Sequence, residues 1–477
     1  MYRKRQQQIA QSRPWILPVS IVLALTLTIT LAVTLTRPPS VVAPPAFSTF
    51  TTSNLQKTVC DCTGNKEPGT DERLISNALA AQSVSIPSPP IGPMNKVLTS
   101  LAVVFGQFID HDITRINTDS SLGRYDIQMV PSEHYMNVSR AVHETVDGCR
   151  HPINFITPFI DATVVYGDSL SDAALLSELR VADSCLLRTS QGDLLPLSED
   201  NMTFVAGDVR AAEQSILTAL HVLFLREHNR LCSELGDYYP TWTQEQLFWK
   251  ARQILIAKLQ HITYEEWLPT FLGDTVYTGA EKRSDAQTVT EFSHLAYRVG
   301  HSMIPNEFGS FPLLGIFFDI SIIQEVGVEP LLQAAYGTAA EKADIKIVDG
   351  LRNFLFSPTM GEDLFVRTLV RARELSLGNY SSIAECYGVT PEDFGDVDAF
   401  VGMLQEPLAT NSPLPTLMGM IISEQFQRIK KYDPYFYTKR RANIGSPWIQ
   451  QVEATTLGSL VRANTNWTDA PMNLFFV

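Results

Sequence analysis

The sequence has little cysteine and little charge for its length. Its 477 residues include 6 Cys, too few to build a disulfide-rich scaffold, so the fold must depend on burial of apolar side chains. Charged residues make up 18% and hydrophobic residues 45%, whereas an average globular protein has about 25% charged residues. This composition excludes a mainly disordered chain. The 26 Gly and 28 Pro follow no period, which excludes a collagen-like fibre.

Basic residues are also scarce. The chain carries 37 Lys and Arg against 51 Asp and Glu, a net charge of −14, which argues against a nucleic-acid partner because a duplex binder needs a basic surface. A single core rarely grows beyond about 250–300 residues, yet no linker or internal repeat follows Cys60. We therefore expect one large, mainly α domain over residues 60–477.

Apolar residues recur at helical spacing through much of this region, and strand-like alternation is scarce. The longest pattern begins at Ala211 and ends at Leu235, before Gly236, which is a typical helix stop. Helices are predicted at residues 98–112, 211–235, 244–262, 289–301, 399–404 and 416–429.

One long apolar run lies near the N-terminus. Residues 15–36 contain no charge, and at about 1.5 Å per residue they are long enough to cross a bilayer. The basic tail at residues 1–14 predicts a cytoplasmic N-terminus and a type II anchor, with the domain at residues 60–477 outside the cell or in a lumen. The alternative is a cleaved signal peptide followed by secretion, although the run is longer than a typical signal core and lacks a clear cleavage site.

Residues 37–59 are rich in Pro, Ser and Thr and predict an extended stalk. The segments beyond it carry Asn-x-Ser/Thr triplets and cysteines. In an oxidising compartment such asparagines can be glycosylated and such cysteines can form disulfides. The connectivity of the cysteines is left open by the sequence. The candidate glycosylation sites are Asn137, Asn201, Asn379 and Asn466, and the cysteines are Cys60, Cys62, Cys149, Cys185, Cys232 and Cys386.

The motif GQFIDHDIT places polar groups at the end of a predicted helix. Gln107, Asp110 and His111 share one helical face, whereas Asp112 points elsewhere. A helix end that meets solvent, or a histidine satisfied within the core, would explain any one of these residues. The cluster as a whole indicates either acid–base chemistry or half of a metal site.

The motif FITPFIDATVVYG alternates oxygen donors. In an extended loop, Thr157, Phe159, Asp161 and Thr163 face the same way, with Phe159 offering its backbone carbonyl. Together with Asp112 they would supply hard oxygen ligands and two negative charges, as Ca²⁺ prefers. The alternative is an ordinary buried strand.

Two further motifs carry candidate residues. In AGDVRAAEQS, Arg210 and Glu213 lie one turn apart at the predicted start of the long helix, where an exposed ion pair is the simple explanation. In AYRVGHSMIP, His301 ends an apolar stretch, where core packing is the simple explanation. No Ser-His-Asp order, Walker loop or HExxH motif stands out.

Several blocks in order resemble the animal haem peroxidase superfamily, which includes the cyclooxygenases. They are GQFIDHDIT, TPFIDATVVYG, AGDVRAAE, LREHNRL, AYRVGH and VDGLRNFLF, and the likeness extends from about residue 60 to about residue 470. The chain resembles the invertebrate peroxinectin and chorion-type members more than the cyclooxygenases. The resemblance implies a helical peroxidase fold that binds haem b and Ca²⁺ and reacts with hydrogen peroxide and a small reducing donor.

The resemblance also implies a role for each motif residue. His111 would be the distal acid–base group and His301 the proximal iron ligand, while Asp110 and Glu213 would form esters to the haem. The implied catalytic set is Gln107, His111 and Arg210, and the implied calcium ligands are Asp112, Thr157, Phe159, Asp161 and Thr163.

The chain departs from the family pattern at two places. Gln214 stands where myeloperoxidase-like members carry a Met that bonds to haem, so chloride oxidation is not expected. Thr368 replaces the Asn that bonds the proximal His, and Glu374-Leu375-Ser376 replaces Asp-His-Gly. We expect a peroxidase that oxidises phenolic or tyrosyl donors, iodide or bromide. The alternatives are an inactive pseudo-peroxidase used for adhesion or matrix binding, and a fatty-acid dioxygenase of the same superfamily.

Overall fold

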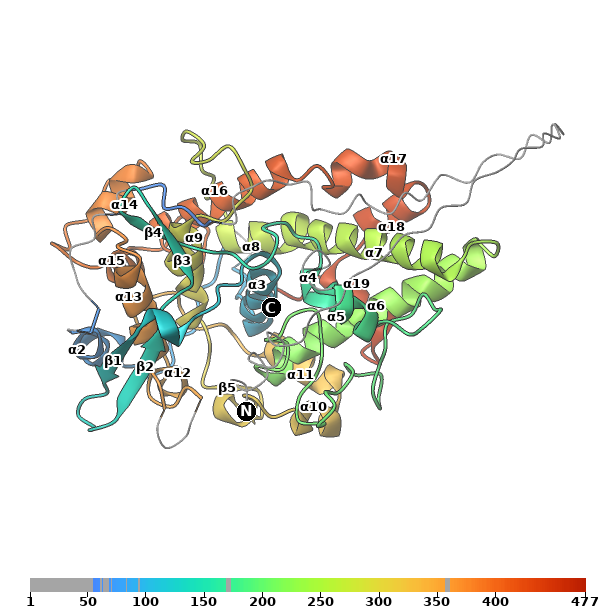
Figure 1. The fold of residues 1–477 in the computed structure, drawn as a ribbon, viewed down its shortest axis with the longest axis horizontal. Coiled ribbons are helices and arrows are strands. Elements are labelled where there is room, and N and C mark those ends of the chain that lie inside the picture. Colours follow the sequence, from blue (N-terminus) through green and yellow to red (C-terminus); the bar gives the residue numbers. More distant parts are fainter. Residues whose placement is uncertain are drawn as a thin grey trace, which may run out of the picture. The chain divides into compact units, whose positions relative to one another are not determined.

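Helices are the main regular structure of the described residues, and short hairpins of strands lie beside them (Figure 1). The computed structural model describes residues 55–60, 62, 68–69, 71–82, 84–92, 95–168, 173–356 and 361–477, all within one compact unit, Val41–Val477. The prediction of a mainly helical domain is confirmed. Among these described residues, no helix is long and apolar enough to cross a membrane. The predicted tail, the anchor at residues 15–36 and most of the stalk lie outside them.

The elements follow one another along the chain without a break between domains. The helices are α2 (Glu72–Ile75), η2 (Ser76–Ala80), α3 (Ser100–Ile113), η3 (Ser120–Leu122), α4 (Thr163–Tyr166), α5 (Ala173–Leu179), α6 (Ser215–Tyr238), α7 (Gln244–His261), η4 (Ile262–Trp267), α8 (Leu268–Leu272), α9 (Thr290–His294), η5 (Ala296–His301), η6 (Leu313–Gly315), α10 (Ser321–Val326), α11 (Val328–Gly337), α12 (Asp349–Arg352), α13 (Leu364–Glu374), α14 (Tyr380–Cys386), α15 (Ala399–Gln405), α16 (Thr416–Tyr432), η7 (Tyr437–Arg440), α17 (Arg441–Ile444), α18 (Trp448–Glu453) and α19 (Leu457–Asn464). The strands are β1 (Arg124–Gln128), β2 (Tyr135–Ser139), β3 (His143–Val146), β4 (Cys149–Pro152), β5 (Glu307–Phe308) and β6 (Phe311–Pro312).

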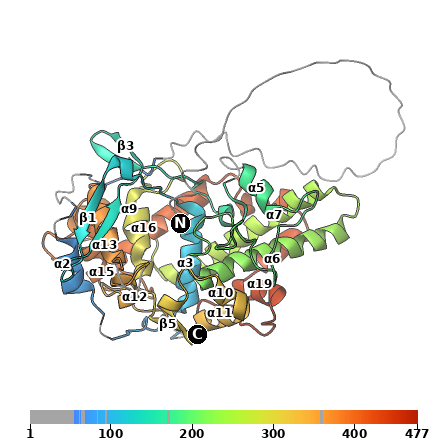
Figure 2. The same cartoon turned by 60° about the horizontal axis from the view of Figure 1, so that its bottom comes forward.

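Helix α3 lies at the centre of the fold. Every residue in it except Gln107 is buried, and a helix that is buried all round belongs to the interior of a large domain. The side chain of Thr99 caps its first turn by accepting a hydrogen bond from the Ala102 amide. Figures 1 and 2 both show α3 beside the long helix α6, which in turn packs along α7. The polar last turn of α3 is therefore held inside the protein rather than in solvent.

The long helix begins later than its apolar pattern predicts. It starts at Ser215 rather than at Ala211, because Gln214 has an extended backbone and its side chain caps the Ile216 amide. Arg210 and Glu213 therefore lie in the turn before α6, and their side chains are positioned by that turn rather than by a helical face.

The helix predicted at residues 289–301 is also interrupted. It divides into α9 and η5 at Leu295, whose φ of −125° and ψ of −78° are not helical. Arg298 Nε donates to the carbonyl of Ser293 at 2.7 Å and so satisfies the end of α9. The break gives the segment that ends at His301 its own direction.

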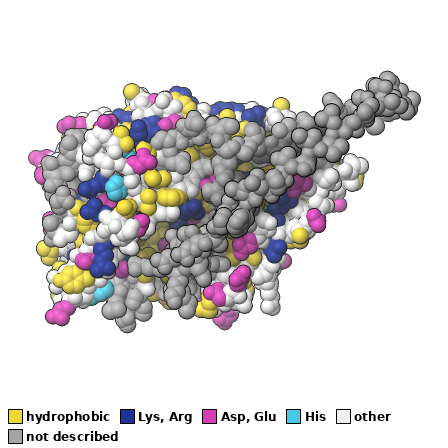
Figure 3. All heavy atoms as spheres, viewed as in Figure 1, with side chains coloured by type: hydrophobic (Ala, Val, Ile, Leu, Met, Phe, Trp, Pro, Cys, Tyr) yellow, Lys and Arg dark blue, Asp and Glu magenta, His cyan; other side chains and the backbone are white. Residues whose placement is uncertain are grey.

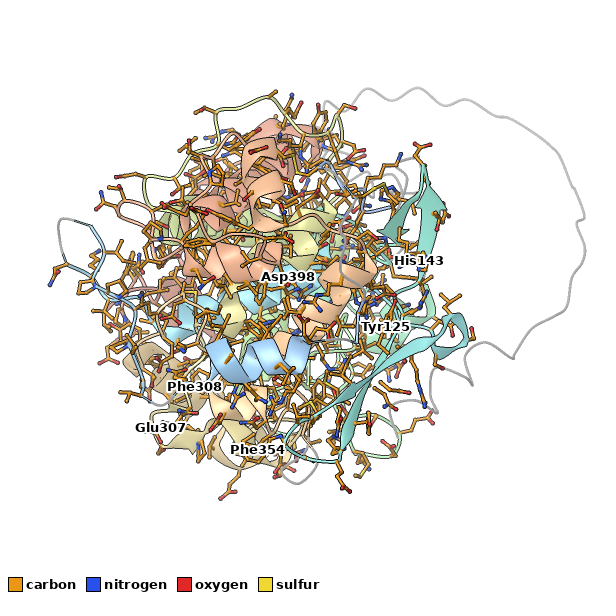
Figure 4. All side chains as sticks on the ribbon, turned by 90° about the vertical axis from the view of Figure 1, so that its left-hand side faces the viewer. Tyr125, His143, Glu307, Phe308, Phe354 and Asp398 are labelled. Atoms are coloured by element: carbon orange, nitrogen blue, oxygen red, sulfur yellow. A yellow bond between two sulfur atoms is a disulfide. The ribbon has the colours of Figure 1, made fainter. Side chains whose placement is uncertain are left out.

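Three antiparallel hairpins, β1–β2, β3–β4 and β5–β6, complete the secondary structure of the described residues. The turn between β3 and β4 is Asp147-Gly148, and both residues have positive φ (52° and 82°), as a two-residue hairpin turn requires. Figure 4 shows the β1–β2 and β3–β4 hairpins, marked by Tyr125 and His143, together on one side of the helices. On the face drawn in Figure 3, the visible acidic and basic side chains are interspersed.

Three disulfides use all six cysteines. They join Cys60 to Cys386, Cys62 to Cys149 and Cys185 to Cys232. The sequence left this pairing open, because it depends on which distant segments meet in space. Two of the bonds attach the start of the domain to α14 and to the β3–β4 hairpin, and the third ties the loop after α5 to α6.

Candidate active site

A cavity of about 370 Å³ lies between α3, the turn before α6, η5 and α13. Most of the residues that the sequence singled out for chemistry line it. From the predicted set they are Gln107, Asp110, His111, Arg210, Glu213 and His301, and the two departures Gln214 and Thr368 also face it. The structure thus brings together residues as far apart in the sequence as Gln107 and Thr368.

His111 occupies the last turn of α3. Its Nε2 lies 4.0 Å from Glu213 Oε2 and its Nδ1 lies 3.9 Å from Asp208 Oδ1. Nδ1 is buried without a hydrogen-bond partner among the described residues. Burial, together with the positive charge of Arg210, holds the pKa of His111 well below its ordinary value. The imidazole is therefore uncharged at neutral pH.

Arg210 is held rigidly by an acidic neighbour. Its Nε and Nη2 both donate to the Asp208 carboxylate at 2.8 Å, and Nη2 also reaches the carbonyls of His111 (3.3 Å) and Thr114 (3.0 Å). Burial alone would raise the pKa of Asp208, but the charge and hydrogen bonds of Arg210 outweigh it and keep that pKa well below its usual range. The guanidinium is thus fixed beside the last turn of α3.

Asp208 was missed by the sequence reasoning. It lies inside the AGDVRAAE block, two residues before Arg210, and it is 1% exposed. The only available signal was a second charged residue so close to Arg210. Sequence spacing gave no sign that Asp208 would turn inward to hold that arginine and approach His111.

Asp110 and Glu213 supply two carboxylates to the cavity wall. Asp110 Oδ2 lies 3.7 Å from Arg298 Nη1 and 4.0 Å from Arg210 Nη1, while its Oδ1 is buried with no hydrogen-bond partner. Burial raises the pKa of Glu213 to about 7. Both carboxyl groups therefore retain oxygens that the described protein atoms leave unused or weakly held.

Gln107 and Gln214 meet at the wall between α3 and α6. Gln214 Nε2 donates to Gln107 Oε1 at 3.4 Å, and Gln214 Oε1 accepts from the Ile216 amide at 2.8 Å. Gln214 is thus part of the helix cap as well as of the cavity. An amide in this place has no sulfur with which to bond a cofactor.

His301 reaches the cavity from the end of η5. Thr368 Oγ1 on α13 lies 3.5 Å from His301 Nδ1 and also donates to the Leu364 carbonyl at 3.0 Å. Burial lowers the pKa of His301 to about 3, with a further contribution from Arg298. An uncharged imidazole is the form that binds a metal.

The altered stretch after Thr368 is built into the fold. Glu374 accepts from the Ala141 amide at 3.0 Å and pairs with Arg371, while Arg373 binds Asp398 through two hydrogen bonds of 2.9 Å. These contacts join α13 to the loop after β2 and to the residue that precedes α15. Glu374, the first residue of the stretch that replaces the family's Asp-His-Gly, therefore has a structural role here.

These groups fit a haem. The cavity combines apolar side chains, among them Val103, Leu351 and Phe308, with an uncharged imidazole on η5 and an unpartnered carboxylate oxygen and imidazole nitrogen on α3. Iron in haem takes a neutral imidazole as its axial ligand. His301, Asp110 and Glu213 are the residues that could hold such a group.

The predicted calcium ligands form a second cluster, which includes Asp112, the residue after His111. Asp112 is fully buried, and its carboxylate accepts from the amides of Asp161 (3.1 Å), Ala162 (3.2 Å) and Val164 (3.0 Å). Asp161 accepts from the hydroxyls of Thr157 (2.7 Å) and Thr163 (2.6 Å). Two buried carboxylates and two hydroxyl oxygens therefore share one place, and burial with mutual repulsion raises the pKa of Asp112.

The loop that supplies this cluster is not the extended segment that the alternation predicted. Ala162 has a φ of 58°, and α4 begins at Thr163. The side chains of Thr157, Asp161 and Thr163 meet because the loop curls around the Asp161 carboxylate, and Phe159 is buried beside them at 3% exposure. The donor set of hard oxygens fits Ca²⁺.

Comparisons with known proteins identify the family to which the chain belongs. A family model described as animal haem peroxidase matches residues 43–392 and 382–475. Peroxinectin A from Dictyostelium discoideum is 28% identical over 463 residues, covering 83% of this chain and 85% of its own. Lactoperoxidase from Mesocricetus auratus is 28% identical over 409 residues, covering 68% of this chain and 55% of its own. The chain thus spans about half the length of that mammalian relative.

Solved structures show the same fold. Peroxidase A from Dictyostelium discoideum superposes with a TM-score of 0.77 at 25% identity, covering 88% of this chain and 95% of that one. A fatty acid alpha-dioxygenase from Arabidopsis thaliana superposes with a TM-score of 0.70 at 17% identity, covering 85% of this chain and 76% of that one, and so shares the fold. With the family model matching nearly the whole described chain, this protein belongs to the animal haem peroxidase family.

Proposed function

We propose that the chain is a haem-dependent peroxidase that reduces hydrogen peroxide and oxidises small donors, either phenols and tyrosyl groups or iodide and bromide. The observation that carries the proposal is the convergence of His111, Arg210 and His301 on one cavity. An imidazole and a guanidinium on one wall and a second, metal-competent imidazole on another are the groups that peroxide cleavage needs.

His301 would bind the iron, and Asp110 and Glu213 would attach the porphyrin through ester bonds. Bound haem would supply the redox-active iron at which peroxide is reduced. Thr368 would orient the His301 ring through the 3.5 Å contact with Nδ1. This contact is longer than an ordinary hydrogen bond, so we expect weaker control of the ring than an Asn would give.

The remaining residues handle the proton and the charge. His111 is uncharged because it is buried, so it can accept a proton from one oxygen of hydrogen peroxide. It then donates this proton to the other oxygen, which leaves as water when the O–O bond breaks. Arg210 stabilises the negative charge that develops on the separating oxygens, and Asp208 keeps its guanidinium in place through two 2.8 Å bonds. Gln107 lines the same side and would help to position peroxide.

The direct test is the spectrum and activity of the purified domain. We expect a Soret band, and peroxide-dependent oxidation of a phenol and of iodide but not of chloride. A folded domain that takes up no haem would favour the pseudo-peroxidase alternative. Oxygen uptake with a fatty acid, without peroxide-dependent phenol oxidation, would favour the dioxygenase alternative, whose fold the chain shares.

We also propose that Asp112, Thr157, Asp161 and Thr163, with the Phe159 carbonyl, bind Ca²⁺. Asp112 and Asp161 lie on segments about 50 residues apart and are buried together. A bound divalent cation would offset the repulsion between their carboxylates. Because Asp112 directly follows His111, the ion would brace the turn that carries the acid–base group.

Asp161→Ala, or prolonged chelation of the wild-type protein, is expected to lower both the melting temperature and the peroxidase activity. The reason is that either treatment leaves the Asp112 carboxylate buried without a cation. Calorimetry and initial rates measure the two effects, with Asp126→Ala on the exposed β1 strand as the control. Elemental analysis that finds no calcium in folded, active protein would refute the site.

The membrane topology remains a proposal from the sequence. We propose that residues 15–36 form an uncleaved anchor with the N-terminus in the cytoplasm, and we expect glycans on at least one of the four candidate asparagines. Asn201, Asn379 and Asn466 are exposed, whereas Asn137 is half-buried on β2, so the first three are the better acceptors. N-terminal sequencing and glycopeptide mass spectrometry test this, and a mature protein that begins shortly after Thr36 would show a signal peptide instead.

A further inference from the structure

A continuous row of aromatic rings leads away from the cavity. Tyr297 lines the cavity, and its ring centroid lies 6.0 Å from that of Phe426 on α16. Phe426 lies 6.0 Å from Tyr264 on η4, Tyr264 lies 5.1 Å from Phe436, and Phe436 lies 5.1 Å from Tyr437 at the start of η7. Every ring in the row is in contact with the next.

The oxidisable members of this row differ in what their polar atoms contact. The hydroxyls of Tyr297 and Tyr264 donate to backbone carbonyl oxygens, at 3.2 and 2.8 Å, and so does the indole N–H of neighbouring Trp267, at 2.8 Å. A carbonyl cannot take up a proton at neutral pH. Tyr437 is different, because its hydroxyl lies 3.0 Å from His261 Nδ1. Of these four residues, only Tyr437 has its polar atom within hydrogen-bond distance of a base.

The state of the Tyr437–His261 pair suits proton transfer from oxygen to nitrogen. Burial raises the pKa of Tyr437 to about 12 and lowers that of His261. The phenol is therefore protonated, and the imidazole is uncharged with a free lone pair. His261 is half-buried at the end of α7, whereas Tyr437 is 4% exposed. The pair thus lies just beneath the surface.

A lysine beside the middle of the row destabilises a positive charge on the rings there. Lys430 Nζ lies 5.1 Å from the ring centroid of Tyr264 and 5.2 Å from that of Phe436. An ammonium group this close repels an oxidised, positively charged ring. Tyr264 is therefore expected to relay an electron without holding the radical, whereas Tyr437 can become a neutral radical by giving up its proton.

We propose that Tyr437, with His261 as its proton acceptor, is a second oxidation site, connected to the cavity through Tyr264 and Tyr297. The inference rests on the proposed peroxidase function, which supplies hydrogen peroxide as the oxidant. One electron leaves the Tyr437 phenol and travels along the row to the peroxide-oxidised centre in the cavity, while the phenol proton moves to His261 Nδ1. A phenolic donor at the surface then gives one electron and one proton to Tyr437 and becomes a phenoxyl radical, while the half-buried His261 releases its added proton to solvent, which restores the pair.

This arrangement defines a class of donor. A phenol carried on a macromolecule is too large to enter a cavity of about 370 Å³, but it can approach the end of α7 where His261 is half-buried. The second site would therefore oxidise tyrosyl groups of proteins or other phenolic polymers, while small phenols and halides react in the cavity.

The test is rapid freezing of haem-loaded protein mixed with one equivalent of hydrogen peroxide, followed by electron paramagnetic resonance. We expect a tyrosyl radical signal that Tyr437→Phe removes for the most part. In parallel, a nitroso spin trap should label the peptide that contains Tyr437, as mass spectrometry would show. His261→Gln keeps a hydrogen-bond acceptor but removes the base, and should also lose the signal.

Tyr166→Phe is the matched control. Tyr166 is likewise buried with its hydroxyl 2.8 Å from a histidine nitrogen, His228 Nδ1, but its ring neighbours are His228 and Phe248, neither of which lines the cavity. The control should keep the wild-type signal. A signal unchanged in Tyr437→Phe, while peroxide still alters the Soret band, would overturn the second site alone. A haem-loaded protein that does not react with peroxide would overturn both proposals.

Discussion

Replacing His301 by alanine is expected to yield folded protein without the wild-type Soret band. His301 is the imidazole that η5 carries into the cavity, and burial keeps it uncharged with a pKa of about 3. Removing the only axial ligand that the protein is proposed to supply leaves the iron to weak ligands such as water. Haem content per folded chain and the absorption spectrum measure the loss.

His294→Ala provides the control for this prediction. His294 is also buried, lines the same cavity and has an unpartnered Nε2, so it is the obvious competitor for the iron. We expect His294→Ala to keep the wild-type spectrum. If the two variants behave the other way round, His294 is the ligand and the assignment of His301 is wrong.

His111→Ala is expected to retain its haem but to react with hydrogen peroxide about 10²–10⁴-fold more slowly, the usual contribution of general acid–base catalysis. His111 lies on α3, whereas the proposed iron ligand lies on η5. The substitution should therefore slow proton transfer without weakening haem binding. Stopped-flow recording of the Soret absorbance after mixing with peroxide measures the rate. Added imidazole should restore part of it, because a small base can enter the space that the side chain leaves.

A buried histidine outside the cavity makes the comparison specific. His221 on α6 is 1% exposed and does not line the cavity, so His221→Gln should change the peroxide rate little. Equally slow reaction of the wild type and His111→Ala would show that this wall of the cavity is not catalytic. In that case Thr368 and the altered stretch after it would mark an inactive relative.

Much of the fold was predictable because it depends on local patterns. The apolar spacing placed α3, α7 and α16 within two or three residues of their observed ends. The break at Leu295 and the late start of α6 were not predictable, because each depends on a tertiary contact. Arg298 bonds the end of α9, and the turn that carries Arg210 is bound to α3.

The site was predictable to the extent that its motifs are recognisable. The residues of GQFIDHDIT, AGDVRAAE and AYRVGH do meet at one cavity. The inward turn of Asp208, the use of backbone amides by Asp112 and the aromatic row to Tyr437 could not be read from spacing. Each of them joins segments whose approach is decided by packing rather than by neighbouring residues.

The two disulfides at the start of the domain have a mechanical consequence. Cys60 and Cys62 are bonded to Cys386 and Cys149, and Glu291 binds the amides of Val59 and Cys60 at 2.9 Å. A pull on the chain that precedes Cys60 is therefore transmitted through covalent bonds to α14 and the β3–β4 hairpin at once. The domain should therefore resist unfolding from its N-terminal end. The force should be distributed to α14 and the β3–β4 hairpin before it reaches α3 and His111.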